Sequence, residues 1–249
     1  MPEHLIWLLL ASFIVGLAKG GLSSSGSLSV PLLSPSMNPS VMPPRLLAIF
    51  IVTDWFAVWL YRRDHSARNI SILVPSILAG VLIATLIVPY TPESLLLIMT
   101  GAVGFWYVMR NWFGSGRRAP ATEARVAPGI FWGTVTGITT FITHSGAPPT
   151  QVYLLPQRLP RLVFAGTMAI TFAIGNAAKI PGYWTLGYFD DLDWSLIALM
   201  ICVGVAGTAA GRQIVKILTD DTYVRVIEVL LFILSLVLFW KAFTLMVAT

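Results

Sequence analysis

Long apolar runs without a charged residue are the feature that most constrains the fold of this chain. No charged residue occurs at 69–92, at 94–109 or at 194–211. A helix needs about 20 apolar residues to cross the hydrocarbon core of a bilayer, and these runs supply them. Only 11% of the 249 residues are charged and 56% are hydrophobic. Because one soluble core could not bury so much apolar surface, the chain is predicted to be a polytopic membrane protein.

Other classes are excluded on the same grounds. A chain this apolar is not intrinsically disordered, and Cys202, the single cysteine, rules out a disulfide scaffold. The net charge of +5 does not indicate nucleic-acid binding, because the basic residues lie in short clusters between apolar runs. Near the N-terminus, Glu3 and His4 replace the basic region of a signal peptide, so no cleaved signal peptide is expected.

The apolar runs divide into spanning helices and a linker. Spanning helices are predicted at 45–61, 70–89, 93–110, 161–184, 193–211 and 222–246. The segment 111–125 contains glycines, arginines and Pro120, a composition typical of a polar linker. We therefore expect a first membrane repeat at 1–110, a cytoplasmic linker at 111–125 and a second membrane repeat at 126–249.

Two apolar regions do not fit a plain spanning helix. Residues 5–33 are interrupted by a Gly/Ser cluster at 20–26, and residues 126–157 are broken at 143–149 by glycine and two prolines. Glycine costs about 1 kcal/mol and proline about 3 kcal/mol in a helix interior. Such a break persists inside a bilayer only where protein or water covers the freed backbone groups.

The basic residues indicate how these regions enter the membrane. Most of the sixteen Lys and Arg residues lie in four clusters: Arg62, Arg63 and Arg68; Arg110, Arg117, Arg118 and Arg125; Arg158 and Arg161; and Arg212, Lys216 and Arg225. The positive-inside rule places all four in the cytoplasm. Residues 126–157 then enter and leave on the same side, as a re-entrant hairpin open to the cytoplasm. By the same reasoning, residues 5–33 form a hairpin that opens outward.

The predicted fold is thus all-α, with two inverted repeats that each hold one broken re-entrant hairpin and three spanning helices. A faint internal repeat agrees with it, since Ser25-Gly26 aligns with Ser145-Gly146 and Asp54 with Asn176 at nearly constant offset. Broken segments at matching positions of two inverted halves point to a secondary transporter with a midplane site. The alternative, in which both broken regions cross fully, would scatter the basic clusters over both faces.

Three stretches carry a resemblance to a known family. They are Gly16-Leu17-Ala18-Lys19-Gly20-Gly21, the segment Gly137 to Pro149 (GITTFITHSGAPP), and Asn176 with Lys179. Together they resemble the TauE/SafE family of sulfite exporters, and the resemblance covers essentially the whole chain. It implies a transporter in the bacterial inner membrane that moves sulfite, sulfonates or related sulfur-containing anions.

The two breaks are suited to hold a small oxyanion. Unpaired backbone N–H groups and the helix dipole favour an anion at a broken helix, glycine allows close approach, and hydroxyls add donors. The predicted substrate-binding residues at the breaks are Gly21, Ser24, Ser25 and Gly26 in the first, and Thr140, His144, Ser145 and Gly146 in the second. If the halves are inverted, the two tips meet near the membrane centre. The alternative is that Ser and Gly merely allow close helix packing.

Four further polar residues lie in otherwise apolar stretches. Lys19 is a candidate anion ligand, with snorkelling or a backbone carbonyl as the alternative. Asp54 is expected to couple protons, as is His144, or to pair with Lys19. Asn176 and Lys179 lie one turn apart and can face one cavity; Lys179 near Pro181 could instead snorkel to the interface.

Close helix contacts are predicted where glycines recur at four-residue spacing. Gly133 and Gly137 form one such pair, and Gly207 and Gly211 form another. Small residues at this spacing let two helix backbones approach closely.

The predicted function is proton-coupled export of sulfite or a sulfonate by alternating access. The alternatives are a permease for an organosulfonate or a sulfur-containing carboxylate, a passive anion channel, and a membrane scaffold without transport. No zinc motif, catalytic dyad or phosphate loop occurs, so an enzyme is not expected. The expected partners are a small anion and the lipid bilayer, without cofactor, metal or nucleic acid; a homo-oligomer is left open.

Overall fold

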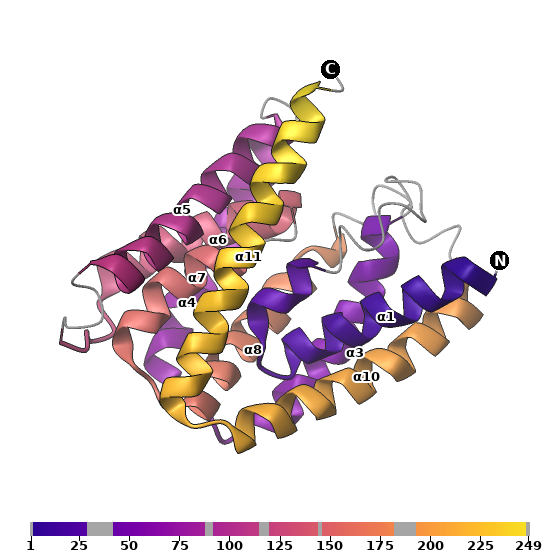
Figure 1. The fold of residues 1–249 in the computed structure, drawn as a ribbon, viewed down its shortest axis with the longest axis horizontal. Coiled ribbons are helices and arrows are strands. Elements are labelled where there is room, and N and C mark those ends of the chain that lie inside the picture. Colours follow the sequence, from indigo (N-terminus) through magenta and orange to yellow (C-terminus); the bar gives the residue numbers. More distant parts are fainter. Residues whose placement is uncertain are drawn as a thin grey trace. The chain divides into compact units, whose positions relative to one another are not determined.

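The computed structural model describes residues 2–28, 42–87, 92–114, 120–143, 146–181 and 193–247, and all regular structure in these ranges is helical. The chain divides into two compact units (Figure 1). Unit 1 comprises Met1–His65 and Leu162–Thr219, and unit 2 comprises Ser66–Arg161 and Asp220–Thr249. Each unit therefore takes helices from both predicted sequence halves.

Unit 1 is built on a close pair of parallel helices. Its elements are α1 (Pro2–Lys19), η1 (Ser23–Leu28), α3 (Met42–Tyr61), most of α8 (Arg161–Ala177) and α10 (Trp194–Ile217). Along α1 and α10, Gly16 lies against Gly204 and Gly20 against Gly211, so both helices run in the same direction. A Cβ atom at Gly16 would overlap the carbonyl oxygen of Gly204. Figure 1 shows the two helices side by side.

The first predicted break is a reversal of the chain. After Lys19 a turn follows at Gly20 and Gly21, and η1 then folds back, so that a Cβ atom at Gly26 would lie 2.9 Å from that of Ala18. Gly21 has a φ of +127°, in the region that glycine adopts at little steric cost. The predicted hairpin is described as far as Leu28, and its return at 29–33 lies outside the described residues.

Unit 2 contains a second parallel pair and an antiparallel pair. Its elements are α4 (Ala67–Ile87), α5 (Glu93–Phe113), α6 (Val126–Thr143), α7 (Ala147–Leu154), η4 (Leu155–Gln157) and α11 (Asp220–Val247). Helices α4 and α6 run in parallel, with Gly80 against Gly137. Helices α5 and α11 run antiparallel, because Gly104 faces Ser235 while the later Asn111 contacts the earlier Glu228.

The two arms on either side of the second predicted break, α6 and α7, form a helical hairpin. Helix α7 returns along α6, with the hydroxyl oxygens of Thr136 and Thr150 2.9 Å apart. The Tyr153 hydroxyl donates to the carbonyl of Arg125. Just before α6, the backbone N–H of Thr122 donates to the carbonyl of Pro156 at 3.0 Å. The chain thus returns to the end at which it entered, as predicted for residues 126–157.

The predicted glycine contacts are confirmed in both parallel pairs. In unit 1, Gly207 lies against the backbone of Phe13 and Gly211 against that of Leu17. In unit 2, Gly137 lies against the backbone of Ile77, and a Cβ atom at Gly133 would come 2.6 Å from the Cβ atom of Ser76. Any larger side chain at these glycines would push the helices apart.

Some helix ends differ from the prediction. Helix α8 ends at Ala177 rather than at 184, because the ring of Pro181 would clash with the carbonyl four residues before it. Helix α5 continues to Phe113, three residues into the predicted linker. Its extra turn is held by hydrogen bonds from Asn111 and Trp112 to the Glu228 carboxylate.

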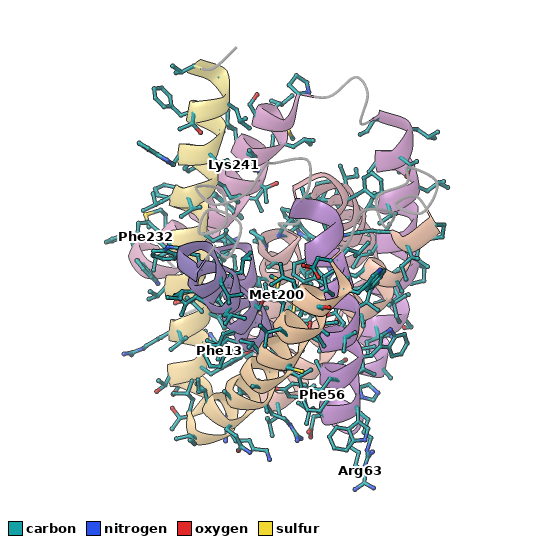
Figure 2. The ribbon with its side chains drawn as sticks, turned by 90° about the vertical axis from the view of Figure 1, so that its right-hand side faces the viewer. Phe13, Phe56, Arg63, Met200, Phe232 and Lys241 are labelled. Carbon is teal, nitrogen blue, oxygen red and sulfur yellow. The ribbon has the colours of Figure 1, made fainter. Side chains whose placement is uncertain are left out.

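The described helices have the length and surface of membrane spans. By length and composition, α4, α10 and α11 could each cross a bilayer, and shorter apolar helices occur at 5–19, 47–61 and 161–177. Large apolar side chains such as Leu86 of α4 and Trp240 of α11 are exposed, which is the arrangement expected of lipid-facing helices. Polar Arg63, by contrast, extends beyond the end of α3 (Figure 2). The chain is a multi-pass helical membrane protein.

Candidate functional site

Unit 1 gathers four of the predicted site residues into one chain of polar contacts. The Lys19 ammonium, at the end of α1, lies 2.7 Å from Oδ1 of Asp54 on α3. The other carboxylate oxygen, Oδ2, accepts a hydrogen bond of 2.7 Å from Nδ2 of Asn176 on α8. The amide oxygen of Asn176 accepts a hydrogen bond of 2.9 Å from Nζ of Lys179 in the turn that follows. Lys19, Asp54, Asn176 and Lys179 are called the K-D-N-K cluster below.

The amide of Asn176 is oriented by its two neighbours. Its NH₂ group can only donate and its oxygen can only accept, and these face the carboxylate of Asp54 and the ammonium of Lys179 respectively. Asn176 therefore links an acid on α3 to a base after α8. The sequence alternative in which Asp54 pairs with Lys19 is present in the structure.

The cluster is almost completely buried. Asp54 is 0% exposed, Lys179 1% and Asn176 3%, while the side chain of Lys19 is 13% exposed. Burial at this level excludes the alternative in which Lys179 snorkels to the interface. Buried charges are tolerated only when they are paired and hydrogen-bonded. With both amines protonated, the K-D-N-K cluster holds two positive charges and one negative charge, which leaves a net charge of +1.

Aromatic residues surround the ammonium of Lys19. Its Nζ lies 4.4 Å from the ring centroid of Phe50 and 6.0 Å from that of Phe172, within range of a cation–π attraction. The Tyr61 hydroxyl donates to the carbonyl of Gly20 in the adjoining turn. These aromatic residues were not among those predicted from the sequence. Phe50, Asp54 and Tyr61 share one face of α3 by helical spacing, and this spacing is a signal that could have found them.

The turn and the cluster lie at different heights along α3. The turn at Gly20–Gly21 lies beside Tyr61, the last residue of α3. Asp54 lies two helical turns earlier, about 10 Å from that end. Within unit 1, the charged cluster and not the tip of the hairpin is nearest the middle of that helix.

The other predicted residues of the first break lie on or after the turn. Gly21, Ser24 and Ser25 are buried, and Gly26 is partly exposed. The Ser25 hydroxyl is buried without a hydrogen-bond partner in the described part of the chain. An unsatisfied buried polar group costs about 1–3 kcal/mol, so this hydroxyl is a donor that a ligand could satisfy.

The predicted residues of the second break belong to unit 2. Thr140 is buried on α6, and Gly146 precedes α7, where its carbonyl accepts a hydrogen bond from the Thr150 hydroxyl. His144 and Ser145 lie outside the described residues. In the described ranges, no group of three or more His, Cys, Asp or Glu side chains could hold a metal ion.

Comparison with known proteins gives one family. The model of the family described as "Sulfite exporter TauE/SafE" matches residues 8–238, which include every element described above except the first residues of α1 and the last residues of α11. No curated protein and no solved structure gives a significant match.

Proposed function

This chain belongs to the sulfite exporter TauE/SafE family, and on that premise we propose that it is a secondary transporter that exports sulfite or a sulfonate through the K-D-N-K cluster. The family implies a membrane transporter of sulfur anions. The observation that supports our finer assignment is the composition of the cluster, in which two lysine amines and one carboxylate are buried together. An anion that enters this cluster neutralises its excess positive charge.

The cluster has the donors that an oxyanion needs. The ammonium groups of Lys19 and Lys179 each carry three N–H donors, and ammonium–oxyanion hydrogen bonds are among the stronger ones. The Asp54 carboxylate contacts the Lys19 ammonium and accepts a hydrogen bond from the amide of Asn176. An arriving anion competes with the Asp54 carboxylate for the same donors.

This competition supplies a route to proton coupling. Protonation of Asp54 removes the only negative charge of the cluster and frees Lys19 for the substrate. Proton binding and anion binding at the cluster therefore reinforce each other, as linkage between two sites requires. The proposed role of His144 as a second proton carrier rests on the sequence alone.

The membrane potential favours export. An inside-negative potential is worth about 2.3 kcal/mol per elementary charge per 100 mV, and it drives anions outward. Saturable transport through a buried site requires that the site open to each side in turn. This is the alternating access proposed for secondary transporters built from inverted repeats.

Helix directions inside each unit support the inverted repeat. Under the positive-inside assignment, α1 and α10 both start outside, α4 and α6 both start inside, and α5 and α11 run oppositely. The glycine contacts agree with these directions for all three pairs. In both units, the first helix of a hairpin packs in parallel on a spanning helix of the other sequence half. Such packing of each half's hairpin on the other half is expected of an internal repeat whose two copies have opposite orientations.

Flux into liposomes that hold the purified protein tests the proposal. We expect saturable flux of sulfite or of an organosulfonate such as sulfoacetate, and we expect that flux to change with a pH gradient. Preference for sulfoacetate would assign the chain to the organosulfonate permeases. Flux that is not saturable and does not change with the pH gradient would indicate a channel. Absence of flux for every sulfur anion tested would favour a membrane scaffold without transport.

A further inference from the structure

A second cluster of charge surrounds a cavity that lies wholly in unit 2. The cavity has a volume of about 670 Å³ and is lined by residues of α5, the segment before α6, the loop after η4 and the start of α11. Four arginines, one from each of these segments, line it: Arg110, Arg125, Arg158 and Arg225. None of them belongs to the K-D-N-K cluster, which lies in unit 1.

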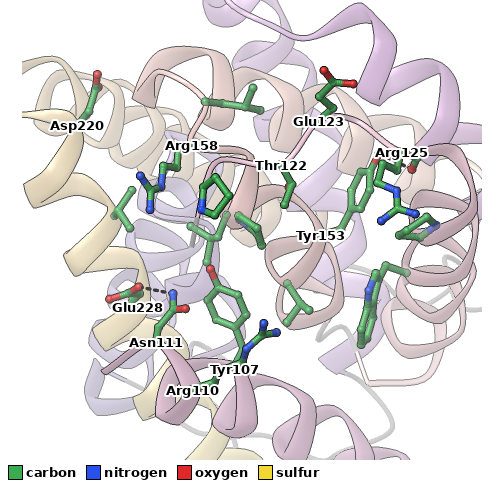
Figure 3. Close-up of a pocket in the computed structure, with 18 of the residues that line it drawn as sticks. Tyr107, Arg110, Asn111, Thr122, Glu123, Arg125, Tyr153, Arg158, Asp220 and Glu228 are labelled. Carbon is green, nitrogen blue, oxygen red and sulfur yellow. Dashed lines mark hydrogen bonds between the residues drawn. The ribbon is translucent and has the colours of Figure 1, made fainter. Parts of the chain in front are cut away.

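The arginines lie around a polar side chain, that of Tyr107, which also lines the cavity. Figure 3 shows the Tyr107 hydroxyl pointing into the cavity, with Arg110 beside it and Arg158 on the other side. Arg125 and Tyr153 lie together at another part of the rim (Figure 3). Since all four arginines are exposed, their guanidinium groups can reach a ligand that enters the cavity from water or from the membrane surface.

Two of the acidic residues that line the cavity are bound to other donors. Glu228 is 1% exposed and accepts hydrogen bonds from Asn111 Nδ2 and Trp112 Nε1, at 2.8 and 3.0 Å. Asp220 accepts hydrogen bonds from the backbone and the guanidinium of Arg161. Glu123 and Asp221, the remaining acids, lie exposed on the rim. Glu228 keeps its negative charge, because Asn111 and Trp112 are neutral donors. Since Asp220 is paired with Arg161, which does not line the cavity, four arginines share the lining with three further carboxylates, those of Glu123, Asp221 and Glu228.

Arg158 is held in an unusual backbone conformation. Its φ is +50°, the only positive φ of a non-glycine residue in the described ranges. A left-handed conformation costs a residue with a Cβ atom about 1–2 kcal/mol, and such strain tends to occur where a side chain must be aimed at a functional site. Here it places Arg158 at the edge of the cavity.

The end of α5 beside the cavity has the composition typical of a membrane surface. Arg110 is in the last turn of α5, where its guanidinium lies 5.4 Å from the exposed ring of Trp106. Tryptophan and arginine together at a helix end are typical of the headgroup region. Basic pockets at the cytoplasmic ends of membrane helices are suited to phosphate-bearing headgroups.

We propose that this cavity binds a phosphate group, carried by a phospholipid headgroup of the cytoplasmic leaflet or by a soluble phosphate ester. Guanidinium groups bind phosphate through paired hydrogen bonds, which is why arginine predominates at phosphate sites. The volume falls within the range of about 300–1,000 Å³ of pockets for whole organic ligands, far more than a bare oxyanion such as sulfite fills.

Calorimetric titration of the purified protein in a neutral detergent tests this proposal. The probes are glycerol 3-phosphate and short-chain phosphatidylglycerol, which separate a soluble ester from a lipid headgroup. The test variant combines Arg110→Gln with Arg158→Asn, because asparagine tolerates the left-handed conformation. Its matched control combines Arg62→Gln with Arg63→Gln, two exposed arginines at the end of α3.

We expect at least one probe to bind, and the test variant to lose about tenfold or more in affinity while the control changes by less than about twofold. A preference for glycerol 3-phosphate assigns the site to a soluble ester, and a preference for phosphatidylglycerol assigns it to lipid. If neither probe binds, or if both variants lose affinity equally, the proposal is wrong. The Lys179→Gln variant should bind the probes normally, so a failure of the transport proposal is distinguishable from a failure of this one.

Discussion

The Lys19 ammonium lies 2.7 Å from the Asp54 carboxylate, and the residues that carry them come from two helices, α1 and α3. Asp54 is fully buried, so each charge of the pair depends on the other. Through Asn176 the same carboxylate is connected to Lys179. A change at Lys19, Asp54 or Lys179 therefore alters the charge that the other two must balance.

The replacement Asp54→Asn should lower the stability of the protein and remove the pH dependence of its transport. The change leaves two buried amines without a carboxylate, and breaking a buried ion pair from one side costs about 3–5 kcal/mol. We expect a lower melting temperature and a flux that no longer responds to pH. Combining it with Lys19→Met should recover part of the lost stability but not the pH response of the flux. A single variant whose flux keeps the wild-type pH dependence would exclude Asp54 from coupling.

Replacement Gly207→Leu should separate the paired helices of unit 1. Gly207 lies against the backbone of Phe13 on α1, and overpacking of a tight contact costs typically about 1–3 kcal/mol, occasionally more. The neighbouring exposed Ala206 provides the control, since Ala206→Leu should change stability by no more than about 0.5 kcal/mol. Melting temperatures in detergent measure both. Equal stability of the two variants would contradict the close contact between α1 and α10.

Cysteine labelling in intact cells should report the sidedness of the helices. Cys202 is the only cysteine and is exposed, so it is first replaced by alanine. A cysteine at Ser195, at the start of α10, should react with an impermeant reagent from outside, because the positive-inside rule places that end outside. A cysteine at Ala121, before α6, should react only after the cells are opened. The reverse pattern would overturn the topology.

The ion pair between Arg161 and Asp220 should contribute to stability in a defined pH range. Hydrogen bonds from Arg161 hold the pKa of Asp220 below its ordinary value. A lowered carboxyl pKa stabilises the folded state above the ordinary carboxyl pKa of about 3.9 and loses that contribution as the pH falls through the lowered value. The effect is small because the Asp220 side chain is 55% exposed.

The pair is measured with the variants Asp220→Asn, Arg161→Gln and the combination of both. Their melting temperatures give a coupling energy at each pH, and we expect a small favourable value at neutral pH that disappears in acid. A coupling energy that grows as the pH falls would contradict the direction of the Asp220 pKa shift.

Much of the fold could be predicted because its signals are local. Apolar runs predicted the helices, and the glycines at 133, 137, 207 and 211 predicted the close helix contacts. Both signals depend only on residues close together along one helix. Helix α8 was predicted too long because the absence of acidic residues and the apolar composition continue past Ala177, whereas the helix ends there and a turn follows at 178–179.

The site was harder to predict from the sequence, because its contacts join segments that lie far apart along the chain. Asp54 and Asn176 are separated by 122 residues and matched in the internal repeat, but a repeat indicates equivalence and not contact. Lys179 could be placed on the face of Asn176 by its spacing, whereas its burial depends on helices that pack around it. Phe50 and Tyr61 were missed because aromatic residues are common on apolar helices, and only their helical spacing from Asp54 sets these two apart.

The central claim, that the excess positive charge of the buried cluster binds the substrate, is tested most directly by Lys179→Gln. Glutamine can still donate to the amide oxygen of Asn176, so the variant should fold while it lacks the charge. The control is Lys216→Gln at the exposed end of α10. We predict that sulfite flux into liposomes falls by about 100-fold or more for Lys179→Gln and stays near wild type for the control. A Lys179→Gln protein with wild-type flux and saturation would contradict the account.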